Sequence, residues 1–341
     1  MAPSLPKTFK AARFLEAGAP LTIVDVPLVQ PSTGEVLVKV LATGVCYSDV
    51  HAQHGSMGSG FPRTPGHETI GDVVAVGEGE KKWKVGDRVG APWHGGHDGT
   101  CKKCQKGLFQ MCDNETVNGI FRDGGYAEYV LLRSEATVRV PTSVDPAAYA
   151  PILCAGVTVF NSIRHMHVMP GEIVAVQGVG GLGHLAVQYA ANMGYRVVAL
   201  SRGSDKEKEA KEFGASEYID QSKEDATEKL QSMGGAALII STAPNPKVIS
   251  PLLGGLGAEG KLLILAPCGE VPINTFAIIP KGISVHGWPS GHANDCEEAI
   301  AFTQANGVHT IVNKFPLADA QKAFENTVAG KAKFRNVLVI G

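Results

Sequence analysis

The sequence predicts an α/β protein of two domains, one a mostly antiparallel β domain and the other a parallel sheet with crossover helices. Three observations support this prediction. At roughly 150 residues per domain, 341 residues are enough for two hydrophobic cores. Near Pro170 the pattern changes from short strands between glycine turns to strands that alternate with helices. Glycine supplies 41 residues without a collagen-like period, which indicates many tight turns inside folded domains.

The first half of the chain is predicted to form an antiparallel β region of barrel or sandwich type. Residues 35–41 alternate polar and apolar side chains, as a half-buried strand does. Residues 69–76 form a second predicted strand, closed by the turn 77–79, and a Gly-Gly turn introduces a third within 122–132. Short strands joined by glycine turns favour antiparallel pairing.

The second half is predicted to contain βαβ units. The apolar run 173–178 is typical of a buried parallel strand, and residues 182–193 follow with helical spacing. Alternation of such strands with helices of about 10–15 residues indicates a parallel sheet. Further predicted strands are 196–200, 237–241, 261–265 and 283–286, and the chain is predicted to end with helices 295–304 and 318–328 and a strand 336–340.

A glycine-rich turn directly after the first strand of this half predicts a dinucleotide site. Its residues are Gly178, Gly180, Gly181, Leu182 and Gly183. The first glycine makes the tight turn, the second lets the backbone approach a pyrophosphate, and the third allows close packing of helix on strand. The N-terminus of the helix then offers amide donors to the phosphates. A packing turn without a ligand is the alternative interpretation.

The residues after the next strand favour NADP(H) over NAD(H). An NAD site has a carboxylate about 20 residues beyond the glycines, where it accepts a hydrogen bond from the ribose 2′-hydroxyl. This chain has Ser201 and Arg202 there, followed by Lys206. A guanidinium offers a planar fork of donors to a 2′-phosphate, so these three residues are predicted to bind that phosphate. A solvated arginine beside a permissive NAD site is the alternative.

Cys101, Cys104 and Cys112 are clustered in one loop, and Asp98 lies three residues before the first of them. The chain has seven cysteines and no export signal, and in a reducing compartment clustered cysteines are more often metal ligands than disulfides. The three thiolates and the Asp98 carboxylate are therefore predicted to bind a structural zinc ion in a closed tetrahedral site. His97 as the fourth ligand, and reduced surface cysteines without metal, are the alternatives.

Composition and charge disfavour several classes of function. The chain has 31 Lys and Arg against 33 Asp and Glu, so no cationic field draws it to nucleic acid or to an anionic membrane. Residues 1–16 lack the apolar core of a secretory signal. The uncharged run 173–195 contains a glycine cluster and polar side chains that a membrane helix would have to bury in lipid. The expected location is the cytoplasm.

Several motifs of the chain together match one family. They are Gly-Val-Cys46-Tyr-Ser48-Asp49-Val-His51, Pro-Gly-His67-Glu68, Val-Gly-Asp-Arg-Val at 85–89, the cysteine loop, Cys154-Ala-Gly-Val-Thr, the glycine turn and Arg335. In this content and order the chain resembles the zinc-dependent medium-chain alcohol dehydrogenases over nearly its full length. The resemblance implies a GroES-like, mostly antiparallel catalytic domain over 1–153 and 291–341, and a Rossmann cofactor-binding domain over 154–290.

The resemblance also implies an activity. The chain would be an alcohol dehydrogenase or carbonyl reductase that reversibly transfers a hydride between a primary or secondary alcohol and NADP(H), and would assemble as a homotetramer or homodimer. Cys46, His67 and Cys154 would hold a catalytic zinc ion with a fourth position open, where the ion lowers the pKa of a bound alcohol. Glu68 would lie beside the ion and enter its shell during ligand exchange. Asp49 would accept from the histidine ligand and fix its tautomer, with a turn-capping aspartate as the alternative.

Further residues receive roles from the same resemblance. Ser48 would take the alcohol proton and pass it through the nicotinamide ribose to His51, whose ordinary pKa near 6.5 suits release to solvent. Trp93 and Trp288 would line the substrate pocket, with ordinary packing as the alternative. Arg335 would reach the cofactor phosphates.

Two other functions stay open on the sequence. A zinc-free quinone or enone reductase of the same superfamily would lack a catalytic metal, and the complete set Cys46, His67 and Cys154 argues against it. A zinc ribbon that binds nucleic acid, with the glycine turn as a redox sensor, would need a basic face with exposed aromatic residues. The lysines of the cysteine loop form one short patch on a chain of net charge −2, which disfavours nucleic acid as a partner.

Overall fold

The chain forms two compact units in the computed structural model, which describes residues 5–340. The first unit runs to Cys154 and also contains Gly291–Thr303 and the chain from His309. The second contains Ala155–Ser290 and Gln304–Val308. Cys154, which the sequence assigns to the start of the second domain, thus belongs to the first unit. Residues 1–4, part of the segment expected to lack a secretory signal, lie outside the described residues.

The main sheet of the first unit is almost entirely antiparallel. Its strand order is β16-β17-β3-β4-β5-β9, with β8 paired to β3, and only β16 and β17 run parallel. The strands are β3 (Glu35–Val45), β4 (Thr69–Val76), β5 (Arg88–Ala91), β8 (Tyr129–Arg133), β9 (Val138–Arg139), β16 (Val312–Pro316) and β17 (Arg335–Val339). Val36, Val38 and Val40 on one face of β3 pack with Trp83 and Val89 in a buried cluster.

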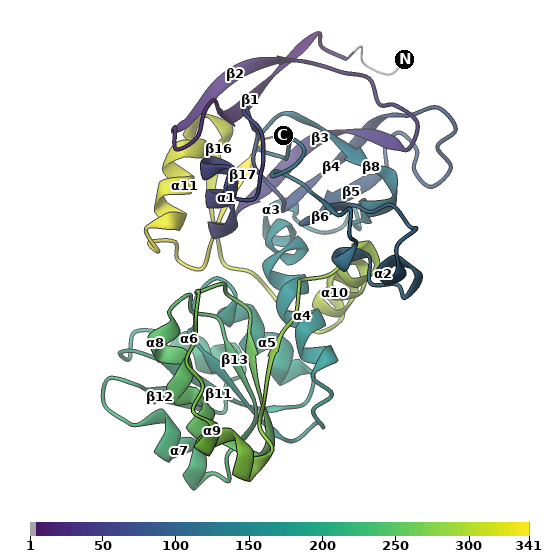
Figure 1. The fold of residues 1–341 in the computed structure, drawn as a ribbon. Coiled ribbons are helices and arrows are strands. Elements are labelled where there is room, and N and C mark those ends of the chain that lie inside the picture. Colours follow the sequence, from purple (N-terminus) through teal and green to yellow (C-terminus); the bar gives the residue numbers. More distant parts are fainter. Residues whose placement is uncertain (1–4, 341) are drawn as a thin grey trace. The chain divides into compact units, whose positions relative to one another are not determined.

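Smaller elements surround this sheet in the first unit (Figure 1). They are the strand pairs β1 (Thr8–Phe14) with β2 (Leu21–Pro27) and β6 (His94–Gly96) with β7 (Thr116–Val117), and the helices α1 (Val50–His54), α2 (Lys102–Gln105), α3 (Pro146–Tyr149), α10 (Ala293–Ala305) and α11 (Ala320–Val328). Helix α11 lies on β17, and its Phe324 packs edge-on against Phe14 with ring centroids 5.5 Å apart. This packing joins the last part of the chain to the first.

The second unit is built on a six-stranded parallel sheet of order β12-β11-β10-β13-β14-β15. Its strands are β10 (Ile173–Gln177), β11 (Arg196–Ser201), β12 (Glu217–Asp220), β13 (Ala236–Ser241), β14 (Leu256–Ile264) and β15 (Ser284–Gly287). Its helices are α4 (Ala155–His165), α5 (Gly183–Asn192), α6 (Glu207–Glu212), α7 (Ala226–Ser232), α8 (Pro246–Ile249) and α9 (Thr275–Ile278), several of which are labelled in Figure 1. This strand order is that of the Rossmann fold, and it opens a crevice at the carboxyl ends of β10 and β13, where the order reverses.

The structure changes several of the expected element bounds. The predicted strand within 122–132 begins only at Tyr129, because the chain before it turns and is fixed by isolated bridges such as Ala11 to Ala127. The predicted strand 261–265 is the second part of the longer β14. Strand β2 lacks a strict alternation of burial, which explains why periodicity alone does not predict it.

No helix of the described chain is by itself long and apolar enough to cross a membrane. One bent pair, Pro146–Leu153 with Ala155–His165, meets the same criterion by length and composition only.

Candidate metal centres and nucleotide site

Four donor side chains cluster in the first unit, three of them buried and that of Cys154 half-buried, with donor atoms all within 4.8 Å of one another: Cys46, His67, Glu68 and Cys154. We call this cluster the buried centre. Cys46 directly follows β3, and His67 and Glu68 directly precede β4. Because β3 and β4 pair antiparallel with Thr43 opposite Thr69, the end of one strand lies beside the start of the other. The first unit therefore brings together donors that are far apart in the sequence.

The charges of the buried centre favour a cation. Contact with the Cys154 thiol lowers the pKa of Cys46 well below its ordinary value, against the effect of burial. Burial lowers the pKa of His67, but Asp49 and Cys46 outweigh it, so that the net pKa lies well above its ordinary value. Burial raises the pKa of Glu68 to about 7, although the Arg335 guanidinium bound to its carboxylate acts in the opposite direction. The negative charge that gathers around His67 would be neutralised equally well by a divalent ion.

The donor set of the buried centre fits zinc. His67 Nε2 is buried and makes no hydrogen bond to any described residue, and the same holds for Glu68 Oε2. A buried polar atom without a partner costs about 1–3 kcal/mol, so these atoms are better explained as facing an ion. Two thiolates and one imidazole are ligands that zinc prefers, and three such ligands leave a fourth position open.

The Asp49 carboxylate contacts two residues of the buried centre. Asp49 is fully buried, and its Oδ1 lies 3.2 Å from His67 Nδ1, which leaves Nε2 for a metal. Its Oδ2 accepts a 3.0 Å hydrogen bond from the Cys46 backbone N–H and a 2.7 Å bond from the Tyr126 hydroxyl. Burial raises the pKa of Tyr126 well above its ordinary value, so its hydroxyl keeps the proton that it donates. Tyr126 is a site residue that the sequence motifs do not single out.

Ser48 and Trp93 contact residues of the same centre, and His51 follows Ser48 in the chain. The Ser48 backbone N–H donates to Cys46 Sγ at 3.5 Å, and Trp93 meets the His67 ring edge-on, with centroids 4.9 Å apart. His51 lies on α1, the short helix that follows, and its ring Nδ1 is 2.9 Å from Ser56 Oγ. The structure thus places Trp93 against a predicted zinc ligand and gives His51 a partner that the sequence does not suggest.

A second group of donors lies in the cysteine loop of the first unit, again with donor atoms within 4.8 Å of one another: Asp98, Cys101, Cys104 and Cys112. We call it the loop centre. The sulfur atoms of Cys101 and Cys104 are 3.6 Å apart, and Asp98 Oδ1 is 3.7 Å from Cys104 Sγ and 3.5 Å from Cys112 Sγ. Tetrahedral zinc with S and O ligands at about 2.3 and 2.1 Å requires ligand separations of about 3.5–3.8 Å. The four side chains therefore fit a closed zinc site, and the group of donors contains Asp98 and not His97.

Local hydrogen bonds hold the Asp98 carboxylate in the loop centre. Its Oδ2 accepts a 2.6 Å bond from the Asn114 amide, and its Oδ1 accepts a 2.8 Å bond from the Thr100 N–H. The Asn114 contact is the main reason why the pKa of Asp98 lies well below its ordinary value. Backbone N–H groups lower the pKa of Cys101 to about 7, whereas burial raises that of Cys104 to about 12.

The glycine turn lies between β10 and α5 in the second unit. Gly178 has a φ of +89°, and a side chain on Gly183 would overlap the Gly178 carbonyl oxygen, so both positions require glycine. Thr242 fixes the turn, because its hydroxyl donates to the carbonyl oxygens of Gln177 and Gly178 at 2.9 and 3.0 Å. Around Gly180 a Cβ would meet no atom within 4 Å, which leaves room for a ligand.

The predicted specificity residues Ser201, Arg202 and Lys206 line one cavity of about 620 Å³ together with Gly178 and Gly180. The fold thus joins the end of β11 to the glycine turn, as a nucleotide site requires. Two other residues, predicted to bind the cofactor phosphates and to line the substrate pocket, contact protein side chains in the structure. Arg335 is buried in the first unit, bound to Glu68, and Trp288 stacks on His165 of the second unit with centroids 3.7 Å apart.

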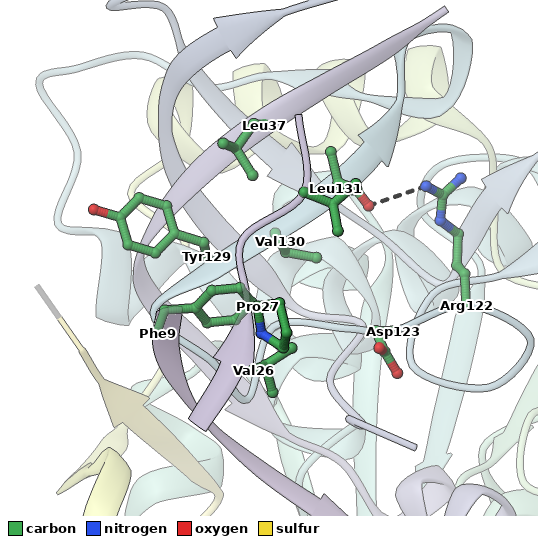
Figure 2. A pocket seen from close by; sticks show the side chains of 10 residues that line it. Phe9, Val26, Pro27, Leu37, Arg122, Asp123, Tyr129, Val130 and Leu131 are labelled. Carbon is green, nitrogen blue, oxygen red and sulfur yellow. Dashed lines mark hydrogen bonds between the residues drawn. The ribbon is translucent and has the colours of Figure 1, made fainter. Parts of the chain in front are cut away.

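A separate cavity of about 230 Å³ lies in the first unit and contains none of the predicted site residues. Figure 2 shows its mostly apolar lining, which includes Phe9, Leu37 and Tyr129. The Arg122 guanidinium in this lining has partners within the protein, because it donates to the Leu131 carbonyl oxygen and pairs with Glu35, both at 3.1 Å. No chemistry is assigned to this cavity.

Comparisons with known proteins agree with this fold. Residues 32–142 match the alcohol dehydrogenase GroES-like domain, and residues 181–305 match the zinc-binding dehydrogenase domain. The chain is 57% identical over 340 residues to alcohol dehydrogenase patD of Penicillium expansum, covering 100% of both chains. Acetophenone reductase from Geotrichum candidum, solved with NAD, has a TM-score of 0.87 at 26% identity and covers 98% of both chains. CAD from Helicobacter pylori, solved with NADP(H), has a TM-score of 0.85 at 26% identity, with 97% of this chain and 98% of that chain covered.

A thiolate and imidazole metal centre on a GroES-like domain, in a chain with a Rossmann domain, defines a zinc-dependent dehydrogenase. More particularly, the chain belongs to the zinc-type medium-chain alcohol dehydrogenase family. The expected fold class is thereby confirmed.

Proposed function

We propose that this chain is a zinc-dependent alcohol dehydrogenase that uses NADP(H) to interconvert small primary or secondary alcohols and their aldehydes or ketones. The observation that carries the proposal is the buried centre, in which Cys46, Cys154 and the free Nε2 of His67 face one another. A zinc-free quinone or enone reductase would have no use for two cysteines and an unpartnered imidazole nitrogen buried together.

Residues of the first unit would have separate roles in the reaction. Cys46, His67 and Cys154 would hold zinc, which supplies Lewis acidity that lowers the pKa of an alcohol hydroxyl. Ser48 lies two residues beyond Cys46, and its hydroxyl would accept the alcohol proton while it passes its own proton on toward His51. His51 passes a proton to solvent, and its contact at Nδ1 with Ser56 leaves Nε2 for that transfer. Trp93, packed against His67, limits the volume beside the open position.

The preference for NADP(H) is supported by the charges around the second-unit cavity. Strand β11 ends at Ser201, without a carboxylate to accept the ribose 2′-hydroxyl, and Arg202 and Lys206 line the same cavity. A 2′-phosphate would receive donors from both cations. One structural neighbour was solved with NAD and another with NADP(H), so the proposed cofactor preference depends on this chain's own residues and not on the neighbours.

One experiment tests the function. Zinc per chain is measured on the purified protein, together with rates on a panel of alcohols, aldehydes and ketones with NADP(H) and NAD(H). We expect about two zinc ions per chain and turnover with a lower KM for NADP(H), and we expect Arg202→Ala to raise the KM for NADP(H) while leaving that for NAD(H) nearly unchanged. Reduction of enones by zinc-free protein would refute the zinc-dependent activity. A lower KM for NAD(H) than for NADP(H) would refute the cofactor preference.

The remaining expectations stay predictions. These are a homotetramer or homodimer, a cytoplasmic location, binding of cofactor phosphates by Arg335, and a substrate pocket that includes Trp288. Sedimentation of the purified protein tests the first of them.

A further inference from the structure

The Asp49 carboxylate receives more contacts than a turn-capping residue needs. The Cys46 backbone N–H bonds it as expected for a cap, at 3.0 Å. A second donor, the Tyr126 hydroxyl, reaches the same oxygen at 2.7 Å from 77 residues away in the chain. The other oxygen faces His67 Nδ1 at 3.2 Å. One buried carboxylate thus connects a tyrosine, a cysteine backbone and a histidine.

Tyr126 is held rigidly by the segment that precedes His67. Its backbone N–H donates to the Pro65 carbonyl oxygen at 3.0 Å, and its own carbonyl accepts from the Ala12 N–H at 2.8 Å. Gly66 has a φ of +109°, and a side chain there would collide with the Tyr126 ring. The side chain is fully buried. The phenol is therefore fixed in direction by the same stretch of backbone that presents His67.

We propose that Tyr126 is a positioning residue of the buried centre, whose hydroxyl fixes the Asp49 carboxylate and thereby holds His67 with Nε2 toward the metal. The proposal rests on the proposed assignment of Cys46, His67 and Cys154 as zinc ligands. Without the Tyr126 hydroxyl, Asp49 Oδ2 keeps only the bond from the Cys46 N–H, so the carboxylate that faces His67 is held less firmly. Groups that orient a metal-bound histidine commonly change metal affinity or activity about 10- to 100-fold.

The test is the rate at which zinc leaves the holoenzyme for a chromogenic chelator. The phase that belongs to the buried centre is identified by its loss in Cys46→Ser. We expect Tyr126→Phe to accelerate this phase about tenfold and to leave zinc loss from the loop centre unchanged. We also expect it to shift the absorption bands of the cobalt-substituted buried centre. Tyr195→Phe is the control, because it removes a phenol bond of 3.0 Å to the Val168 carbonyl in the second unit.

Asp49→Asn separates positioning from simple packing. We expect this variant to release zinc at least as fast as Tyr126→Phe, and the double variant to release it no faster than Asp49→Asn alone. Unchanged release in Asp49→Asn would overturn the proposal even if Tyr126→Phe did not fold. Additive effects in the double variant, or unchanged cobalt bands in Tyr126→Phe, would also overturn it. If wild-type protein showed no release phase that depends on Cys46, the assignment of zinc to the buried centre would fail. If zinc were bound there but left at the same rate in Tyr126→Phe, only the role of Tyr126 would fail.

Discussion

The two candidate metal centres of the first unit are built in opposite ways. The buried centre takes its donors from three distant stretches of chain, which meet in the interior where β3 ends and β4 begins. The loop centre takes all of its donors from residues 98–112, and Asp98 and Cys101 there are only half-buried. The buried centre depends on the fold already being formed. The loop centre can form from a local segment and then hold that segment in place.

The two centres also differ in what they leave free. In the buried centre the fourth donor residue, Glu68, is bound to Arg335 through Oε1, and Cys46, His67 and Cys154 would hold zinc with one position open for a substrate oxygen. In the loop centre Asn114 directs Asp98 at the cysteines, so that four donors lie together and would close the site around an ion. An open site supports chemistry and a closed site supports stability.

The largest expected effect is on activity. Cys46→Ser removes one thiolate of the buried centre, and we expect kcat/KM to fall about 10³-fold or more, since metal Lewis acidity contributes several kcal/mol to such reactions. Zinc content should fall by about one ion per chain. Cys268→Ser is the control, because that half-buried cysteine belongs to neither centre. An activity within about tenfold of wild type would contradict the role of the buried centre.

The next effect is on stability. Cys104 is buried in the loop centre, and Cys104→Ser should release the second zinc ion and lower the free energy of unfolding by about 3–4 kcal/mol, because loss of a structural metal is among the few single changes with effects that large. The folded fraction should keep kcat within about twofold of wild type. Thermal unfolding with and without chelator, together with rates below the transition, measures both. A large loss of kcat without a loss of stability would mean that the loop centre is not merely structural.

Local elements of the fold were predictable and its long-range pairings were not. The alternation at 69–76 and the apolar run that forms β10 specify strands through their own side chains. Nothing local in residues 312–316 or 335–339 tells that β16 and β17 continue the sheet beside β3. Strand order depends on which distant segments pack together, and periodicity carries no signal for that.

In the candidate site too, local features were predictable from the sequence and long-range contacts were not. Spacing alone predicted the loop centre, because its donors are near neighbours in sequence. The buried centre needed the family resemblance, since a lone Cys46 or His67 has no distinctive pattern. Tyr126 was missed because a tyrosine after two glycines does not show that its hydroxyl meets Asp49. The contact of Arg335 with Glu68 was missed for the same reason, because the two residues come together only in the folded sheet.

A smaller effect concerns the residue that orients Asp98. Asn114 is exposed, so Asn114→Ala should cost little folding energy but loosen the carboxylate. We expect zinc to leave the loop centre about tenfold faster, with no change at the buried centre. Asp113→Asn is the matched control, since it weakens only a surface ion pair with Lys103. Equal release from both variants would show that any change in this loop, rather than the Asn114 contact, loosens the metal.

The smallest expected effect separates the centres by the sign of their pH dependence in metal-free protein. The pKa of Asp98 is lowered on folding, so its contribution to stability is present above about pH 4 and is lost as pH falls through the lower folded-state pKa. The pKa of Glu68 is raised to about 7, so its contribution instead declines as pH rises from about 4 toward 7. Urea unfolding with chelator should therefore show that Asp98→Asn removes part of the acid destabilisation below about pH 4 and leaves the decline toward neutral pH in place. Because Asp98 is partly exposed, water screens its interactions and the difference should be small. If Asp98→Asn altered the neutral rather than the acid limb, the carboxylate would not be held by Asn114 and Thr100 as the structure has it.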